Sequence, residues 1–407
     1  MREATIVDAV RTPRGKGKPG GALSGVHPQE LLATVLAELQ KRVGFSPADV
    51  DDVLTGCANA IGDHADNIAR LSALAAGWPA SVPGLTMNRA CGSGQQALNT
   101  AATMVVSRQA ELVVASGVEM MSRYPAATRP TLDGGNERLR GLYPLIPQGI
   151  SADLIATVGG FSRADVDAFA ALSQRRAADA IGEGRFDGSL VPVTDAGGTV
   201  LLDRDELPRP TTLDALAALK PSFEKLGTQV WEGYDRSFDA MAREAYPRVD
   251  RIAHVHHAGN SSGLADGAAA VLVARSDVAR ERGWRARARV VATATAGAEP
   301  VIMLTAPGPA AKLCVARAGM SMKDIDLFEV NEAFASVVLR FAEETGVDLD
   351  RVNVNGGAIA LGHPIGASGP ILLATLLDEL ERRDLNTGLV TMCTGGGMAT
   401  ATVIERV

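Results

Sequence analysis

The chain has 407 residues, enough for two ordinary domains or one large composite domain, and 46% of them are apolar. Its net charge of −7 argues against nucleic acid as the main partner, because nucleic acid usually binds a concentrated basic surface. The N-terminal residues carry charges where a signal peptide needs an apolar core, and no apolar run approaches about 18 residues. We therefore expect a cytoplasmic protein without a membrane partner.

Apolar β-branched runs alternate with runs rich in alanine and leucine, which is typical of an α/β fold. In chain order, the pattern predicts a strand at 3–10, a helix at 27–43 and strands at 51–57 and 110–121. An amphipathic helix is predicted at 162–181, within a stretch of polar loops. The different character of this stretch indicates an inserted lid or loop domain.

The late part of the chain repeats the order of the early part. The matching pairs of segments are 44–56 with 319–331, 85–88 with 352–355, and 111–117 with 388–394. Three matches in one order indicate a duplicated α/β unit packed against itself. The predicted domains are a first half at 1–121 plus 256–275, the inserted domain at 122–255 and a second half at 276–407.

The first candidate for chemistry is Cys91, in the stretch NRACGSGQQA. The four cysteines lie far apart without a Cys-x-x-Cys pair, which fits neither a zinc ribbon nor a disulfide framework. Cys91 is placed where a strand gives way to a helix, and the unpaired amides of a helix start favour a thiolate. Gly92 and Gly94 let another backbone or a ligand approach closely. A packed structural cysteine is the competing interpretation of this stretch.

Three later motifs carry further polar groups. His363 lies in the glycine-rich loop 353–369, where a neutral imidazole could accept the proton of a thiol. Cys393 precedes three glycines whose backbone N–H groups could stabilise an oxyanion. Asn331 follows a predicted strand, at the edge where α/β sheets commonly bind ligands. A lone loop histidine, a glycine-rich hairpin and a helix cap are the corresponding structural alternatives.

These motifs, in this order, resemble those of the thiolases, the acyl-CoA:acetyl-CoA acyltransferases. The motifs that carry the resemblance are NRACGSGQQAL, GNSSGLADGAAA, VNEAFA, NGGAIALGHPIGASG and CTGGGMATA. The resemblance implies the thiolase-like α/β fold, in which two duplicated halves form a five-layered αβαβα core with an inserted lid. It also implies the degradative cleavage of a 3-oxoacyl-CoA by CoA, as in fatty acid β-oxidation, through an acyl-cysteine intermediate.

The resemblance assigns a role to each site residue. Cys91 would be the acylated nucleophile, His363 would take its proton, and Cys393 would move the α-proton of acetyl-CoA. Asn331 would hold a water facing the enolate oxygen, and the backbone N–H groups of Cys91 and Gly395 would face the acyl oxygen. CoA would be bound as a substrate by Ser262, Gly263, Ala333, Phe334 and, at its phosphates, Arg209. The expected partners are 3-oxoacyl-CoA, acetyl-CoA, CoA and further copies of the chain in a dimer or tetramer, with no metal and no tightly bound cofactor.

The lid departs from the family pattern. Pro147 and Gln148 stand where many thiolases have His-Met, and the segment 229–257 looks longer than usual. Its aromatic residues could line or cover an acyl pocket, which predicts an acyl group larger than acetoacetyl; they are Trp231, Tyr234 and Phe238. The nearby His254, His256 and His257 are expected to lie in an exposed linker and to bind no metal.

Several alternatives stay open at this point. A biosynthetic acetoacetyl-CoA thiolase would run the same chemistry in the condensing direction. A ketoacyl-synthase-like enzyme would share the duplicated fold, although Cys393 before TGGG favours a thiolase. A cysteine hydrolase would use Cys91 and His363 with water as the acceptor. A CoA-binding protein without activity is the fourth alternative.

Overall fold

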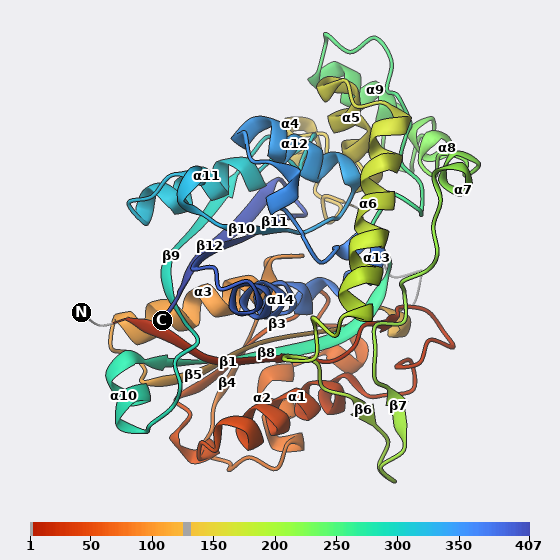
Figure 1. Ribbon diagram of the computed structural model, residues 1–407. Helices are drawn as coiled ribbons and strands as arrows, with labels where there is room; N and C mark the ends of the chain where they lie inside the picture. Colours follow the sequence, from red (N-terminus) through yellow and green to blue (C-terminus); the bar gives the residue numbers. More distant parts are fainter. Residues whose placement is uncertain (1–2, 125–131) are drawn as a thin grey trace.

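The computed structural model describes residues 3–124 and 132–407 (Figure 1). The strands in these ranges are β1 (Ala4–Arg11), β2 (Gly15–Lys16), β3 (Asp52–Gly56), β4 (Gly84–Met87), β5 (Leu112–Met120), β6 (Val193–Thr194), β7 (Val200–Leu202), β8 (Ala265–Arg275), β9 (Ala288–Gly297), β10 (Leu327–Val330), β11 (Thr387–Thr394) and β12 (Met398–Arg406). The helices are α1 (Pro28–Val43), α2 (Ile68–Ala75), α3 (Ser93–Val106), α4 (Glu137–Leu142), α5 (Gln148–Gly159), α6 (Arg163–Gly182), α7 (Leu213–Ala217), α8 (Glu224–Gly227), α9 (Phe238–Ala245), α10 (Ser276–Glu281), α11 (Pro307–Arg317), α12 (Ala335–Thr345), α13 (Ala358–Leu361) and α14 (Ser368–Arg382).

The predicted elements agree with this structure, and local chemistry explains their ends. Helix α1 begins after His27, whose side chain accepts the N–H of Gln29, and it stops at Gly44, which is left-handed at φ 74°. Helix α6 begins with a capping box between Ser162 and Asp165. Strand β5 is buried along its whole length, as expected of a strand that helices cover on both faces.

The described strands show the duplication directly. Ten of them form one sheet in the order β10-β11-β12-β9-β1-β8-β5-β3-β4, with β2 on β8. In the first half, β3 is parallel to β4 and β5, and β5 is antiparallel to β8. In the second half, β10 is parallel to β11, which is antiparallel to β12, and Val352 bridges β10 in the place of β4. The antiparallel pair of β1 and β9 joins the two halves.

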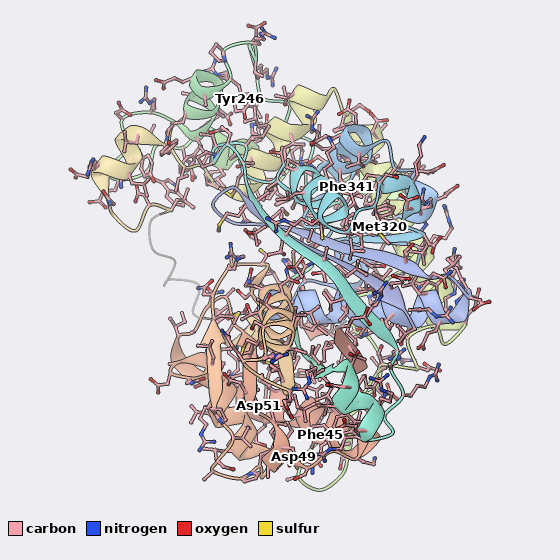
Figure 2. The ribbon with its side chains drawn as sticks, turned by 90° about the vertical axis from the view of Figure 1, so that its left-hand side faces the viewer. Phe45, Asp49, Asp51, Tyr246, Met320 and Phe341 are labelled. Atoms are coloured by element: carbon pink, nitrogen blue, oxygen red, sulfur yellow. The ribbon has the colours of Figure 1, made fainter. Side chains whose placement is uncertain are left out.

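The sheet folds around a central helical layer, which gives five layers in all (Figure 1). Helices α3 and α14 pack between the two halves, where their apolar side chains form one core with both. Helices α1 and α2 cover the outer face of the first half, and α11 and α12 cover that of the second. Figure 2 places Phe45 and Phe341 in these two outer layers. The predicted five-layered core of two halves is therefore confirmed.

Glycines permit a close crossing in the central layer. A Cβ on Gly94, at the start of α3, would lie closer than 3.0 Å to the carbonyl oxygen of Gly366, and so would a Cβ on Gly117 of β5. A Cβ on Gly56 of β3 would overlap the backbone at Gly94. Gly92 packs in the same way against Thr394. The close approach predicted for Gly92 and Gly94 is thus present, and the neighbour is protein backbone or side chain.

The residues predicted to form the lid contain helices α4 to α9, most of them short apart from the 20-residue α6, with the small hairpin β6–β7. In Figure 1 most of these helices lie at one end of the layered core. The predicted domain boundaries stay a prediction. Among the described residues, no helix has both the length and the apolar character required to cross a membrane.

His256 and His257 are buried and His254 is half-buried, so the expected exposed linker is wrong. His254 lies 2.7 Å from Asp153 and 3.1 Å from Asp239, and His256 lies 2.7 Å from Asp153. Asp153, on α5, also accepts the backbone N–H groups of Val255 and His256. These carboxylates supply the partners that a buried imidazole requires. In the described part of the chain, no cluster of three or more His, Cys, Asp or Glu side chains has the geometry of a metal site.

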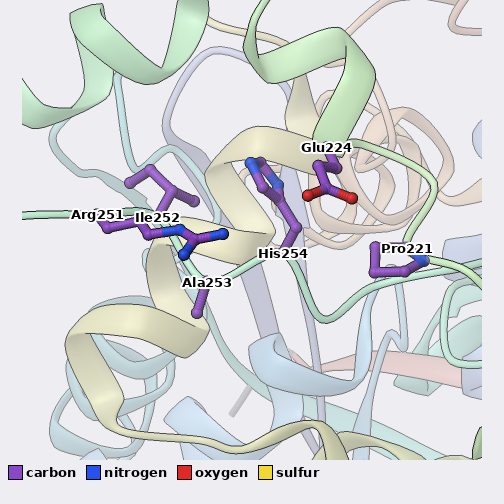
Figure 3. Close-up of a pocket in the computed structure, with 6 residues that line it drawn as sticks. All are labelled: Pro221, Glu224, Arg251, Ile252, Ala253 and His254. Atoms are coloured by element: carbon purple, nitrogen blue, oxygen red, sulfur yellow. The ribbon is translucent and has the colours of Figure 1, made fainter.

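His254 contacts one carboxylate on α5 and one on α9, and it therefore links these two helices of the lid. A pocket of about 360 Å³ beside it is lined by Pro221, Glu224, Arg251, Ile252, Ala253 and His254 (Figure 3). Burial by itself lowers the pKa of His254, but the hydrogen bonds to Asp153 and Asp239 raise it to about 9. The imidazole is therefore protonated at neutral pH and bridges two negative charges.

Replacing Gly94 with alanine should destabilise the fold by about 1–3 kcal/mol, because the new methyl group overlaps the backbone at Gly366. Chemical denaturation measures this loss. Gly182 is the matched control, since it also lies in a helix but has nothing within 4 Å of a Cβ. Gly182→Ala should keep or raise stability. Equal stability of the two variants would contradict the crossing.

The stability of the protein should fall as the pH rises from 6.5 to about 9. The pKa of His254 in the folded protein, about 9, lies above the ordinary value of 6.5. Its contribution to the free energy of unfolding is therefore complete below pH 6.5 and is lost as the pH rises through 9. Thermal unfolding of wild type and His254→Gln across this range measures the effect. The variant lacks the titrating group, so its melting temperature should change less. Parallel curves for the two proteins would be evidence against the bridge between Asp153 and Asp239.

Candidate active site

Cys91 lies in a tight turn between β4 and the start of α3. The residue before it, Ala90, has φ 46°, a left-handed conformation that costs energy for any residue with a side chain. Two side chains hold this turn: Asn88 Oδ1 accepts the N–H of Ala90 at 2.8 Å, and Ser93 Oγ donates to the Ala90 carbonyl at 2.6 Å. The thiol is therefore held in a fixed place just before the helix.

Burial raises the pKa of the Cys91 thiol to about 11, even though the N–H of Gly395 donates to the sulfur and lowers it. The negative charge of Glu119 raises this pKa further. The expected ease of thiolate formation at a helix start is thus outweighed by burial. At neutral pH Cys91 is a thiol, and it requires a base before it can act as a nucleophile.

His363 is a buried, neutral base held by three contacts. Its backbone N–H donates to the carbonyl of Gly263 at 2.8 Å, and its ring Nδ1 lies 2.6 Å from Ser368 Oγ. Its Nε2 lies 3.4 Å from Asn331 Nδ2. Burial lowers the pKa of His363 to about 4, and the positive charge of Arg14 acts in the same direction. With Nδ1 bound to Ser368, Nε2 is left as the position that can accept a proton.

Asn331 and Cys393 come from neighbouring parallel strands. Asn331 directly follows β10, and its N–H donates to Thr391 of β11 at 3.0 Å. Cys393 lies two residues further along β11, where burial raises the pKa of its thiol and the charge of Cys91 raises it more. Gly396 and Gly397 are left-handed and turn the chain, so that Gly395 lies at Cys91. The site thus brings Cys91, Cys393 and Gly395 together.

The residues predicted to bind CoA flank the His363 loop. Ser262 donates its N–H to Ala333 at 2.9 Å, and Gly263 donates to Ala358 at 3.2 Å. Phe334 is buried, with its ring 5.9 Å from that of Phe223. Arg209 is exposed, and its backbone N–H donates to Gln174 of α6. The structure therefore places four of the five residues at the site and leaves Arg209 on the neighbouring surface.

The predicted lid aromatics pack on one another. Phe238 is 1% exposed, and its ring lies 4.9 Å from Trp231 and 5.7 Å from Tyr234. It belongs to an apolar cluster that continues through Ile150 and Phe334 to Cys393. Phe238 is thus core rather than the lining of an open pocket.

Sequence reasoning missed three residues of the site. Glu119 is a buried carboxylate on β5, Ser368 contacts His363, and Arg14 donates to the carbonyl of Gly362 at 3.2 Å. An acidic residue inside the otherwise apolar strand 112–120 was a usable signal for Glu119. Gln148 was noted only as a departure, and its amide lies beside Gly395.

The arrangement suits covalent acyl transfer. A thiol that requires a base, a neutral imidazole, a second buried thiol and a backbone N–H donor are the parts that such a reaction uses. A negative charge on Cys91 raises the pKa of the Cys393 thiol, so these two thiols affect one another's titration.

Comparison with known proteins agrees with this chemistry. The thiolase N-terminal domain family matches residues 4–230, and the thiolase C-terminal domain family matches residues 284–406. The steroid 3-ketoacyl-CoA thiolase FadA6 of Mycobacterium tuberculosis is 41% identical over all of this chain and 95% of its own length. An acetyl-CoA acetyltransferase of Thiocystis violacea is 40% identical, with 98% of each chain covered.

A solved structure agrees as well. The crystal structure of the Bacillus anthracis acetyl-CoA acetyltransferase superposes with a TM-score of 0.84 at 35% identity and covers 100% of this chain and 99% of its own. The chain belongs to the thiolase family of acyltransferases.

Proposed function

We propose that this thiolase cleaves a 3-oxoacyl-CoA with CoA into acetyl-CoA and a shortened acyl-CoA, through an acyl-Cys91 intermediate. The observation that supports this most is the meeting of the Cys91 sulfur with the Gly395 N–H and the buried thiol of Cys393. An N–H donor beside the sulfur suits the oxygen of a thioester formed there.

In the first step, the Cys91 sulfur attacks the keto carbon while His363 Nε2 accepts the thiol proton. The bond between the α and β carbons then breaks, which leaves the acyl group on Cys91 and the electron pair on acetyl-CoA as an enolate. Cys393 donates its proton to the α carbon and completes acetyl-CoA. Asn331 and His363 would stabilise the enolate oxygen, Asn331 through a bound water.

In the second step, the thiol of an incoming CoA attacks the thioester carbon. The acyl oxygen, negatively charged in the tetrahedral intermediate, would accept the N–H groups of Cys91 and Gly395. The thiol proton of CoA passes to the Cys393 thiolate. The sulfur of Cys91 leaves as the acyl-CoA forms and takes back the proton held by His363. The high pKa of the Cys91 thiol, about 11, explains why a neighbouring neutral base is needed in the first step.

CoA would lie along Ser262 and Gly263, with its thioester end near Ala333 and Phe334. The backbone contacts of these residues with one another and with His363 support this path. Arg209 lies on the exposed surface nearby, where a guanidinium suits the phosphates of CoA. No step of the reaction calls for a metal or for a tightly bound cofactor.

The proposed direction is degradative, with an acyl group larger than acetoacetyl. Relatives named 3-ketoacyl-CoA thiolase, at 40% identity over all of this chain, support this direction. The 41% identity to a relative named steroid 3-ketoacyl-CoA thiolase supports a large acyl group, whereas the core position of Phe238 does not. Biosynthetic acetoacetyl-CoA thiolase is the second candidate, favoured by the acetyl-CoA acetyltransferases among the relatives.

A homo-oligomer, dimer or tetramer, is also proposed. Strand β4 lies at one end of the described sheet, and Leu85 on it is 46% exposed. An edge strand with an apolar side chain is a ready surface for a second copy. Sedimentation of the purified protein tests this, and a monomer at micromolar concentration would contradict it.

Intact-mass spectrometry with a panel of 3-oxoacyl-CoAs should reveal an acyl adduct on Cys91. The added mass identifies the acyl group, and we expect medium, branched or ring-bearing groups to react faster than acetoacetyl-CoA. Faster turnover of acetoacetyl-CoA would contradict the proposed acyl size. Release of free acid without CoA would instead indicate a hydrolase.

Two variants separate the steps of this reaction. Cys91→Ser should lose the adduct and the cleavage together. Cys393→Ser should still take an acyl group from an acyl-CoA but lose carbon–carbon cleavage by a factor of about 100 or more, because the proton donor is gone. Wild-type cleavage by either variant would overturn the assigned roles.

A further inference from the structure

Glu119 is a fully buried carboxylate that the proposed reaction does not use. It lies on β5 and is 0% exposed. Its Oε2 accepts the N–H of Ala58 at 2.9 Å and that of Gly366 at 2.8 Å. Its Oε1 accepts the N–H of Asn59 at 3.2 Å, and Tyr124 Oη and Cys57 Sγ donate to the same oxygen. A buried carboxylate with this many hydrogen-bond donors is held in one position, and it holds the segments that donate to it.

One hydrogen bond of Glu119 holds the loop that carries His363, the proposed base. Gly366 lies three residues after His363, in the turn between His363 and α14. The carbonyl oxygen of Gly366 packs against Gly94 and Gly117, while its N–H is held by Glu119. The His363 loop is therefore fixed by glycine packing through this oxygen and by the carboxylate through this N–H.

A series of hydrogen bonds also runs from Glu119 to the turn of Cys91, the proposed nucleophile. Ala58, whose N–H donates to Glu119, accepts Asn88 Nδ2 on its own carbonyl at 2.9 Å. Asn88 Oδ1 in turn accepts the N–H of Ala90, the left-handed residue directly before Cys91. Three hydrogen bonds in series thus connect Glu119 to the Cys91 turn.

We propose that Glu119 is a positioning residue that holds the Cys91 turn and the His363 loop in register through one carboxylate oxygen. This inference rests on the proposed function, because it gives these two residues the roles of nucleophile and base. A displacement of either loop by about 1 Å is enough to cost a large factor in rate, since attack requires close and aligned atoms.

Electrostatics offers a second readout. The charge of Glu119 raises the pKa of the Cys91 thiol. Burial raises the pKa of Glu119 itself to about 7, against hydrogen bonds from Ala58, Gly366 and Asn59 that lower it. The other polar groups that face this carboxylate are the side chain of Asn59, the thiols of Cys57 and Cys91 and the hydroxyl of Tyr124. Removing the charge should therefore make the Cys91 thiol more acidic.

The test compares Glu119→Gln and Glu119→Asp with the wild-type enzyme and with Asp266→Asn. Asp266 is a buried carboxylate on β8 that accepts the N–H of Ser122, so it controls for the loss of a buried acid. The measurements are kcat and KM with the preferred 3-oxoacyl-CoA, the melting temperature, and the rate at which iodoacetamide alkylates Cys91 as a function of pH.

Glu119→Gln should lower kcat about 10- to 100-fold, the usual effect of losing a residue that orients a reacting group, with little change in KM. Its alkylation profile should move to lower pH. Glu119→Asp keeps the charge but is too short to reach both N–H groups, so it should lower kcat without moving the profile. Asp266→Asn should do neither.

A kcat within twofold of wild type for both Glu119 variants would overturn the proposal. An equal loss of kcat in Asp266→Asn, in proportion to its loss of melting temperature, would also overturn the proposal. If Glu119→Gln does not fold, Glu119→Asp and its alkylation profile decide. A wild-type enzyme that cleaves none of the 3-oxoacyl-CoAs would contradict the proposed function instead, while the alkylation profiles would still test the link between Glu119 and Cys91.

Discussion

The carbonyl oxygen of Gly366 packs so closely against two glycines that neither of them could carry a side chain. Gly94 on α3 and Gly117 on β5 both lie against this oxygen, and a Cβ on either would come closer to it than 3.0 Å. This contact joins an element of the first half to a loop of the second, which carries His363. These glycines let the Cys91 turn of the first half and the His363 loop of the second half approach one another closely.

The chemistry of the site depends on keeping its groups neutral until the substrate arrives. Burial raises the pKa of Cys91 to about 11 and lowers that of His363 to about 4, so at rest the site holds a thiol and a neutral imidazole. In the proposed reaction, proton transfer from Cys91 to His363 would create two opposite charges inside the protein. Donors already in place, such as the N–H of Gly395, then stabilise the new negative charge without rearrangement.

Much of this structure could be predicted from the sequence, because hydrophobic periodicity and repeats are local properties. The strand at 4–11, the helix at 28–43 and the duplicated halves followed from such patterns. The partners of buried polar groups did not, because they come from distant parts of the chain. Glu119 and Gly366 are 247 residues apart, and the carboxylate that pairs with His254 is 101 residues away. Without these partners, a histidine-rich segment looks like an exposed linker.

The central claim is that the buried imidazole of His363 activates Cys91 for acyl transfer. The most direct measurement is the rate at which Cys91 becomes acylated by its 3-oxoacyl-CoA in wild type and in His363→Gln, followed by rapid quench and mass spectrometry. The account predicts a loss of about 10²- to 10⁴-fold, the range for removing a general base. Alkylation of Cys91 by iodoacetamide at a pH where the thiolate is fully formed should be unchanged. Acylation of His363→Gln at the wild-type rate would contradict the account.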